Sequence, residues 1–257
     1  MTASHPSDAA PSGTIVTAAI LVIGDEILSG RTKDKNIGFI AEYCTNIGID
    51  LKEVRIVPDE NDRIVDAINE LRARYTYLFT TGGIGPTHDD ITADAVAEAF
   101  DTTLEINDRI VEIMKSRRPG YEITPARLRM ARVPKGGGLI ENTVSGLPGF
   151  YIGNVYVMAG VPSVMQAMFD ALVPMLRTGD RILSETIDAG RPESVISAPL
   201  GAIQEAHPDT MIGSYPYFEE GRFATRIVVR ARDAALLKTV AGEVEAMLDT
   251  LPKTDKH

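Results

Sequence analysis

One stretch of the chain, residues 77–92, places three glycines between an apolar run and a helical pattern. The apolar run from Tyr77 to Phe79 predicts a buried strand. Gly82, Gly83 and Gly85 follow it, and glycine allows both positive φ angles and close approach of a ligand to the backbone. A helical pattern then places Ile91, Ala95, Val96 and Ala99 on one face. Because free N–H groups and the positive end of the helix dipole meet at such a junction, the stretch predicts an anion site.

Two carboxylates and a threonine lie where this helix is expected to start. Asp89, Asp90 and Thr92 are residue types that favour a helix N-terminus. Two carboxylates there also suggest a metal ion between protein and phosphate. The alternative is an ordinary tight turn followed by a capped helix. The stretch matches neither the Walker loop nor the G-x-G-x-x-G fingerprint.

Two further strand-and-helix units precede the glycine turn. The runs 16–23 and 51–57 predict strands, and helical patterns start near Asp34 and Asn61. Three such units in succession predict an α/β domain with a parallel sheet, helices on its faces and right-handed crossovers.

Acidic residues follow each of these three strands. Asp25 with Glu26, then Asp59, then Asp89 and Asp90 are all at carboxyl ends of strands, which meet at one edge of a parallel sheet. Like charges at that edge repel, so a cation or a hydrogen-bonding ligand is expected to offset the cost. The alternative is that each carboxylate is a solvated cap of its own helix.

The segment 101–132 is predicted to be helical and carries the highest density of basic residues. These are Arg109, Lys115, Arg117, Arg118, Arg127, Arg129 and Arg132. One interpretation is a cluster that reaches a phosphate at the acidic edge. A solvated helix face explains the same pattern.

Two later loops contain further glycines. Strands are expected within 139–158, interrupted by a loop with Ser145, Gly146 and Gly149, and a second loop at Gly160 leads into a helix. Both loops can add backbone to the same pocket. The helix has an apolar face of Met165, Met168, Phe169, Leu172 and Met175, which is typical of a core or an interface.

From Thr178 the pattern changes to β-α-β-β-α, with Pro199 expected to interrupt or kink the first helix and a turn at 219–221. This order predicts a small α+β domain. We therefore expect a disordered tail over 1–14, an α/β domain over 15–177 and the small domain over 178–257.

Composition limits the partners of the chain. Its 257 residues carry a formal net charge of -10, which argues against binding to nucleic acid or to an anionic membrane. The single cysteine, Cys44, excludes an intrachain disulfide and is expected in the core. No apolar run is long enough for a membrane span, and the N-terminal segment lacks the positive charge of a signal peptide. A cytoplasmic protein is expected.

Three motifs together carry a resemblance to a known family. They are Gly24-Asp25-Glu26-Ile27-Leu28-Ser29-Gly30 with Asn36, then Pro58-Asp59, then the stretch Thr80–Thr92. They resemble the molybdopterin-binding (MoaB/Mog-like) domain, in the version found in the CinA-like (competence/damage-inducible protein A) branch. The resemblance covers about Ala18 to Leu176, and the small domain that follows is similar to its counterpart in CinA-like proteins.

The resemblance implies a three-layer α/β/α sandwich, with a mostly parallel sheet and a pocket at the strand ends. It implies that Asp59 and Asp90 are critical and that the glycine turn holds the phosphate of a pterin or a nucleotide. The residues expected to bind this ligand are Gly24, Asp25, Glu26, Thr81, Gly82, Gly83, Gly85, Pro86, Thr87, Ser145, Gly146, Gly149 and Gly160.

In the CinA-like branch the resemblance further implies metal-dependent hydrolysis of a pyrophosphate of the ADP-ribose type. Asp59, Asp89 and Asp90 would hold Mg²⁺, Mn²⁺ or Co²⁺, and Asp90→Asn would abolish turnover while leaving the fold intact. His88 is expected to be a solvent-facing loop residue. The deamidase domain that often ends such proteins is not expected in this chain.

One departure from the family pattern keeps other functions open. The loop 158–165 lacks the first proline and the acid of the family motif, and Val164 stands where the acid is expected. A non-catalytic carrier of molybdopterin or nucleotide is one alternative, and an oligomer with a vestigial site is another. The resemblance also implies a homo-oligomer, a dimer or a trimer, with the methionine-rich helix faces as candidate contacts.

Overall fold

The structure is a computed structural model that describes residues 14–117, 120, 122–219 and 222–252. The chain divides into two compact units, with the boundary between Gly179 and Asp180. Among the described residues, no helix is both long enough and apolar enough to cross a membrane.

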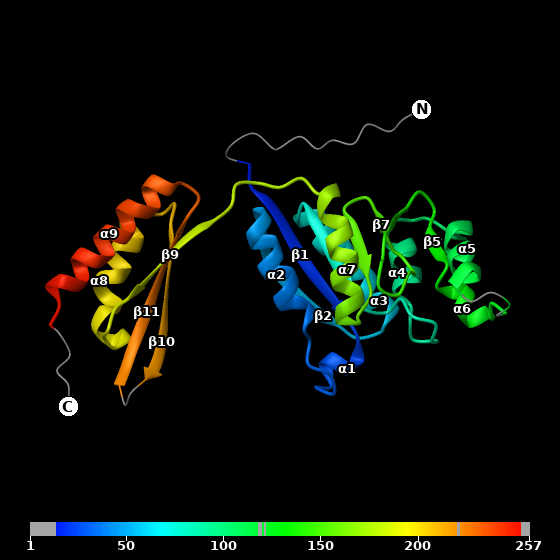
Figure 1. The fold of residues 1–257 in the computed structure, drawn as a ribbon, viewed down its shortest axis with the longest axis horizontal. Coiled ribbons are helices and arrows are strands. Elements are labelled where there is room, and N and C mark those ends of the chain that lie inside the picture. Colours follow the sequence, from blue (N-terminus) through cyan, green and yellow to red (C-terminus); the bar gives the residue numbers. More distant parts are fainter. Residues whose placement is uncertain (1–13, 118–119, 121, 220–221, 253–257) are drawn as a thin grey trace. The chain divides into compact units, whose positions relative to one another are not determined.

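The first unit is built on a six-stranded sheet with the order β2-β1-β3-β8-β7-β6. Strands β1, β2 and β7 of this sheet are labelled in Figure 1. Strands β1, β2, β3 and β8 are parallel, and β7 and β6 run antiparallel to their neighbours. The strand bounds are β1 Val16–Ile23, β2 Ile49–Val57, β3 Tyr77–Thr81, β6 Gly138–Ile140, β7 Gly149–Ile152 and β8 Val155–Met158.

Strand β1 shows why the sheet is covered on both faces. Its residues alternate between two cores, with Ala19, Leu21 and Ile23 in one and Ala18 and Ile20 in the other. The first core is covered by α3 (Asn61–Arg74), α4 (Thr92–Ala99) and α5 (Asp108–Arg117), and the second by α2 (Asn36–Ile47) and α7 (Pro162–Leu172). A strand buried on both faces is apolar along its whole length, as the sequence predicted. The expected three-layer α/β/α sandwich is confirmed.

The basic segment is less helical than predicted. It begins with strand β4 (Leu104–Ile106), continues through α5 and α6 (Pro125–Arg129), and ends in β5 (Arg132–Pro134), which pairs with β4. A three-residue strand is too short to show an alternation in the sequence, which is why the pattern looked helical. Arg118 lies outside the described residues.

Two predicted helix starts are also corrected. Helix α4 begins at Thr92, so Asp89 and Asp90 precede it and are not part of its first turn. Asp34 lies before α2, where its Oδ1 accepts a hydrogen bond from the N–H of Ile37 at 2.7 Å. In addition, Asp25 and Glu26 open a short helix, α1 (Asp25–Leu28).

The methionine face of α7 is core and not a surface for contact with another subunit. Met165 and Met168 are fully buried beside Phe169 and Leu172. Met175 is exposed, but it lies in the short 3₁₀ helix η1 (Val173–Met175) that follows. Met165 and Met168 are therefore not available for contacts with another subunit, because the core of this unit already covers them.

Cys44 is in the core, as predicted. Its side chain is buried in α2, and burial raises the pKa of the thiol to about 12. The thiolate is the reactive form of cysteine, so this thiol is not a nucleophile at neutral pH.

The second unit has the predicted β-α-β-β-α order. Strands β9 (Leu183–Asp188), β10 (Met211–Glu219) and β11 (Arg222–Ala231) form an antiparallel sheet in the order β10-β11-β9. Helices α8 (Glu193–Ala206) and α9 (Ala234–Thr250) bury Ile196 and Val240 with the core of this unit. Pro199 lies inside α8 without ending it. Part of the predicted turn at 219–221 lies outside the described residues.

Candidate functional site

The glycine turn after β3 is tied to three neighbouring elements. Gly82 has a φ of 104°, and its N–H donates to the carbonyl oxygen of Met158 in β8 at 3.1 Å. A Cβ on Gly82 would lie 2.1 Å from the carbonyl oxygen of Ile23 in β1. Thr92 of α4 closes the turn, since its hydroxyl donates to the oxygen of Gly82 at 3.0 Å and its N–H to the oxygen of Gly83 at 3.1 Å. The turn is therefore a fixed part of the sheet edge.

The carboxylate of Asp90 shapes the rest of the loop. One oxygen accepts from the N–H of Gly85 at 2.6 Å, and the other accepts from the N–H and the hydroxyl of Thr87 at 2.8 and 2.5 Å. Three hydrogen bonds to one carboxylate hold residues 85–90 in a tight turn. Asp90 thus fixes the shape of the loop before α4, whereas the sequence had suggested either a metal ligand or a residue at the start of the helix.

A cavity of about 650 Å³ opens above this turn. Many of the predicted site residues line it, namely Glu26, Gly82, Gly83, Gly85, Pro86, Asp90, Ser145 and Gly160. Arg129, Arg132 and the apolar side chains of Met130, Val133, Leu147, Phe150, Val164 and Met168 complete much of the wall. The glycine turn and both later loops do meet in one pocket, as the sequence predicted.

Other predicted residues lie outside the cavity lining. These are Gly24, Asp25, Asp59, Thr81, Thr87, Asp89, Gly146 and Gly149. Thr81 is buried at the end of β3, and Gly149 is packed so that a Cβ would lie 2.4 Å from the carbonyl oxygen of Val157. The N–H of Gly24 is bonded to the carbonyl of Val57. We assign Thr81, Gly149 and Gly24 to the packing of the sheet.

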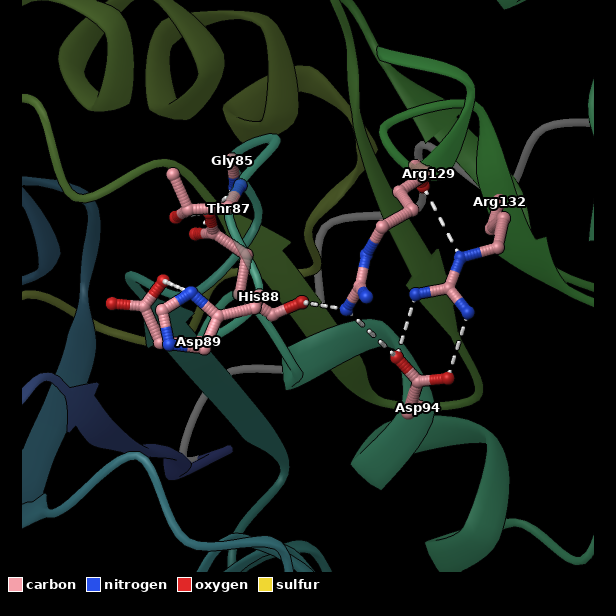
Figure 2. Close-up of polar contacts among 8 residues, drawn as sticks. Gly85, Thr87, His88, Asp89, Asp94, Arg129 and Arg132 are labelled. Carbon is pink, nitrogen blue, oxygen red and sulfur yellow. Dashed lines mark hydrogen bonds and ion pairs between the residues drawn. The ribbon is translucent and has the colours of Figure 1, made fainter. Parts of the chain in front are cut away.

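Two arginines from the basic segment lie at the cavity wall. Arg132 binds both oxygens of Asp94 at 2.8 and 2.6 Å, and Arg129 donates from Nη2 to the carbonyl oxygen of Asp90 at 3.1 Å. Figure 2 shows both guanidinium groups converging on Asp94 beside the turn. Asp94 is 4.0 Å from Arg129 and is already in a bidentate pair with Arg132. The charge of Arg129 is therefore the less compensated of the two.

Asp59 lies near other acidic side chains at the sheet edge, namely Asp25, Glu26 and Asp89. The Asp59 carboxylate accepts a hydrogen bond from the N–H of Asp25 at 3.0 Å. Partial burial raises the pKa of Asp59, and the negative charges of Asp25, Glu26 and Asp89 raise it further, while that hydrogen bond acts in the opposite direction. Asp25 and Asp59 therefore meet at this edge, the charges of Glu26 and Asp89 act on Asp59, and Asp90 is turned into its own loop.

Replacing Asp59 by asparagine is expected to stabilise the fold at neutral pH. Because the pKa of Asp59 is raised in the folded state, its protonated carboxyl adds to the free energy of unfolding. This added stability is lost as the pH rises through the folded-state pKa and the carboxyl ionises. At pH 7 the ionised Asp59 therefore costs stability, whereas the amide of the variant is uncharged and keeps an acceptor for the N–H of Asp25. Urea unfolding of both proteins at pH 7 and at pH 3.5 checks this. Equal differences in unfolding free energy at the two pH values would contradict it.

The predicted metal ligands do not fit a resident ion as they stand. The described residues do not bring Asp59, Asp89 and Asp90 together as a ligand set, and the Asp90 carboxylate already accepts hydrogen bonds from Gly85 and Thr87. In the part of the chain that the structure describes, no three His, Cys, Asp or Glu side chains are grouped so that they could hold a metal ion. His88 has a side chain that is 97% exposed and 4.0 Å from the carboxylate of Asp89, which agrees with a solvent-facing loop residue.

Asn142 is a site residue that the sequence did not single out. It is buried, and its Nδ2 donates to the hydroxyl of Ser145 at 2.6 Å and to the carbonyl of Leu147 at 2.9 Å. Its Oδ1 accepts from the N–H groups of Val144 and Ser145. These four bonds fix the loop that carries Ser145 into the cavity. An asparagine at the start of a loop is the one sequence signal that could have indicated this.

The chain is similar to proteins of two described families. Residues 19–178 match the family described as "Probable molybdopterin binding domain", and residues 181–253 match that described as "FAD synthase, middle domain". A protein of Pyrobaculum arsenaticum is 31% identical over 91% of this chain and 96% of its own length. A CinA-like protein of Citrifermentans bemidjiense is 34% identical over 90% of this chain, which spans 58% of that relative.

Among solved structures, the protein CinA from Thermoplasma acidophilum, whose function is given as unknown, has a similar fold. It superposes with a TM-score of 0.59 at 30% identity, covering 63% of this chain and 99% of that one. The first unit therefore shares both sequence and fold with this structure.

Proposed function

Because the chain belongs to the molybdopterin-binding (MoaB/Mog) domain family, with CinA-like proteins among its relatives, we propose that its cavity binds a phosphate-bearing pterin or nucleotide. The phosphate lies at the glycine turn, and the ring system lies against the apolar wall of the cavity.

The observation that carries this proposal is a set of unused donors at the turn. Among the described residues, the N–H groups of Gly83 and Ile84 donate to no protein acceptor, and both residues line the cavity. The first turn of α4 begins beside them and adds the positive end of its dipole. Arg129 adds a positive charge, since within the described part of the chain its contacts occupy one Nη2 donor and its buried Nε has no hydrogen-bond partner. Backbone donors and a guanidinium group are the usual partners of phosphate.

The apolar part of the wall supports a flat ring as the other half of the ligand. Phe150, Val133 and Met168 are buried side chains that line the cavity next to Met130 and Leu147. A cavity of about 650 Å³ lies within the range of small-molecule sites, which are mostly apolar with a few polar groups that fix orientation. A phosphorylated heterocycle matches both parts of the lining.

Arg129→Met is expected to remove most of the affinity that the phosphate contributes. Matched probes are FMN against riboflavin and AMP against adenosine, titrated by calorimetry with EDTA present. We expect the wild type to bind FMN more tightly than riboflavin, and AMP more tightly than adenosine. We expect Arg129→Met to weaken the binding of FMN and of AMP by about 10-fold or more, because a charge-assisted hydrogen bond contributes about 1.5–3 kcal/mol.

The control for this titration is Arg74→Met. Arg74 lies at the far end of α3 and is paired on the surface with Glu53 and Glu70, so it loses the same charge at a distance from the cavity. The proposal fails if FMN and riboflavin bind equally to the wild type, or if both variants weaken FMN to the same extent.

Hydrolysis of a nucleotide pyrophosphate is a second candidate function. The feature that favours hydrolysis is a set of four acidic side chains beside the turn, namely Asp25, Glu26, Asp59 and Asp89. Glu26 also lines the cavity. Divalent ions bound to nucleotide phosphates need only one or two protein carboxylates. The test is release of AMP from ADP-ribose, with FAD for comparison, in Mg²⁺, Mn²⁺ or Co²⁺ and with EDTA as control. Release that requires the metal and is lost in Asp59→Asn supports hydrolysis, and binding without release supports a carrier.

A further inference from the structure

A buried asparagine lies behind the part of the cavity wall that Gly160 and Val161 form. Asn36 is the first residue of α2, and it is 3% exposed. Its Nδ2 donates to the carbonyl oxygen of Gly160 at 2.9 Å, across 124 residues of sequence. Gly160 and Val161 line the cavity, whereas Asn36 does not belong to the lining. Asn36 therefore contacts the wall from its protein side.

Packing alone does not account for a polar side chain at this position. The Oδ1 of Asn36 is buried and has no hydrogen-bond partner among the described residues. A buried acceptor without a partner lowers stability, and an apolar side chain of similar size would avoid that cost. In the part of the chain that the structure describes, the bond to Gly160 is the one hydrogen bond that this side chain makes. Holding the backbone of the cavity wall is thus what the asparagine contributes.

This bond sets the direction of the peptide group between Gly160 and Val161. The peptide is trans, so its carbonyl oxygen and the N–H that follows point in opposite directions. Because the oxygen of Gly160 points at Asn36, the N–H of Val161 points away from it. Among the described residues this N–H has no acceptor, and Val161 is 59% exposed. The orientation leaves a free backbone donor on the accessible side of the wall.

The same wall lies against the glycine turn. A Cβ on Gly160 would have the Cα of Gly82 as its nearest neighbour, at 3.4 Å. Gly82 is also bonded to Met158, two residues before Gly160. The N–H of Val161 and the free N–H groups that follow Gly82 therefore belong to adjacent parts of the lining.

We propose that Asn36 is a positioning residue that turns the N–H of Val161 toward the phosphate bound at the glycine turn. The phosphate then accepts a hydrogen bond from Val161 as well as from Gly83 and Ile84, and Asn36 itself contacts only the protein. This inference rests on the proposed function, because it adds a donor to the same phosphate site.

Amide shifts and affinities test this role together. Wild type and Asn36→Leu, both labelled with ¹⁵N, are titrated with FMN and with riboflavin, and calorimetry gives the affinities. In the wild type we expect FMN, but not riboflavin, to shift the amide of Val161 in addition to those of Gly83 and Ile84. In folded Asn36→Leu we expect the Val161 shift to be lost. FMN should bind this variant about 5-fold or more weakly, and riboflavin affinity should change by less than about 2-fold, because riboflavin has no charged group for the lost hydrogen bond.

Asn154→Leu is the matched control. The Nδ2 of Asn154 also donates to backbone carbonyls, those of Arg72 and Tyr75 at 2.9 and 3.0 Å. Asn154 precedes β8, however, whereas Gly160 follows it. We expect this variant to keep the preference of the wild type for FMN over riboflavin. Thermal unfolding shows whether both variants fold, and the wild-type titration stands in either case.

Three results would overturn the role of Asn36. In the first, FMN shifts Gly83 and Ile84 of the wild type but leaves Val161 unshifted. In the second, folded Asn36→Leu keeps the full preference for FMN. In the third, Asn154→Leu loses that preference to the same extent. If FMN shifts neither Gly83 nor Ile84 of the wild type, the proposed function fails, and the role of Asn36 fails with it.

Discussion

Replacing Gly82 by alanine is expected to lower the free energy of unfolding by about 2–5 kcal/mol. The added Cβ would lie 2.1 Å from the carbonyl oxygen of Ile23, and neither backbone can move without breaking the pairing of β1 with β3. The φ of 104° adds strain for any residue with a side chain. Overpacking of a fixed site contributes about 1–3 kcal/mol of this loss, and the backbone strain contributes the rest. Urea unfolding followed by circular dichroism measures the loss.

Gly160→Ala provides the matched control for this substitution. Gly160 lies in the loop next to Gly82, but a Cβ there would first meet the Cα of Gly82 at 3.4 Å, which is an ordinary contact. We expect Gly160→Ala to change the unfolding free energy by less than about 1 kcal/mol. Equal stability of the two variants would show that the glycine turn is not held against β1.

Asp90→Asn is expected to lower both stability and affinity for phosphate-bearing ligands. The carboxylate accepts three hydrogen bonds from Gly85 and Thr87, and an amide would direct an NH₂ group at one or two of these donors. Loss of bonds to a charged group predicts about 2–4 kcal/mol in unfolding free energy. Because the same loop carries the amides of Gly83 and Ile84, we expect FMN to bind about 10-fold or more weakly.

Asp89→Asn is the control that separates the loss of a negative charge from the loss of the hydrogen bonds that Asp90 accepts in the turn. It removes the same negative charge one residue away, from an exposed side chain. Hydrogen bonding with Thr87 lowers the pKa of Asp89, but this carboxylate does not bridge Gly85 to Thr87. We expect the unfolding free energy of Asp89→Asn to stay close to that of the wild type, as for most surface substitutions. A loss as large as that of Asp90→Asn would contradict the structural role assigned to Asp90.

The sheet and the edge that carries the candidate site were predictable from local patterns. The continuous apolar run of β1 indicated a strand buried on both faces, and Gly82 with Gly83 marked the turn where ligands bind in parallel sheets. The positions of Asp25 and Asp59 at strand ends followed from topology alone. The strands, the glycine turn and the acidic residues at strand ends could be predicted because they depend only on the order of residues along the chain.

The direction of individual side chains was not predictable in the same way. Asp89 and Asp90 are neighbours of one type, yet the Asp90 carboxylate is the one that bridges the N–H groups of Gly85 and Thr87. Arg117 contacts Ser145, 28 residues further along the chain, through space that only the absence of a side chain on Gly146 provides. The methionines of α7 were ambiguous between core and interface, because apolar periodicity does not say what covers a face. Tertiary contacts decided all three.

The measurement that tests the central claim most directly is an NMR titration of amide groups. Protein labelled with ¹⁵N is titrated with FMN and, separately, with riboflavin, and the shifts of the backbone amides are followed. The proposed function predicts that FMN causes its largest shifts at Gly83 and Ile84, that these shifts are small with riboflavin, and that phosphate ions compete. FMN shifts located elsewhere, or shifts at these two amides that riboflavin reproduces in full, would contradict a phosphate site at the glycine turn.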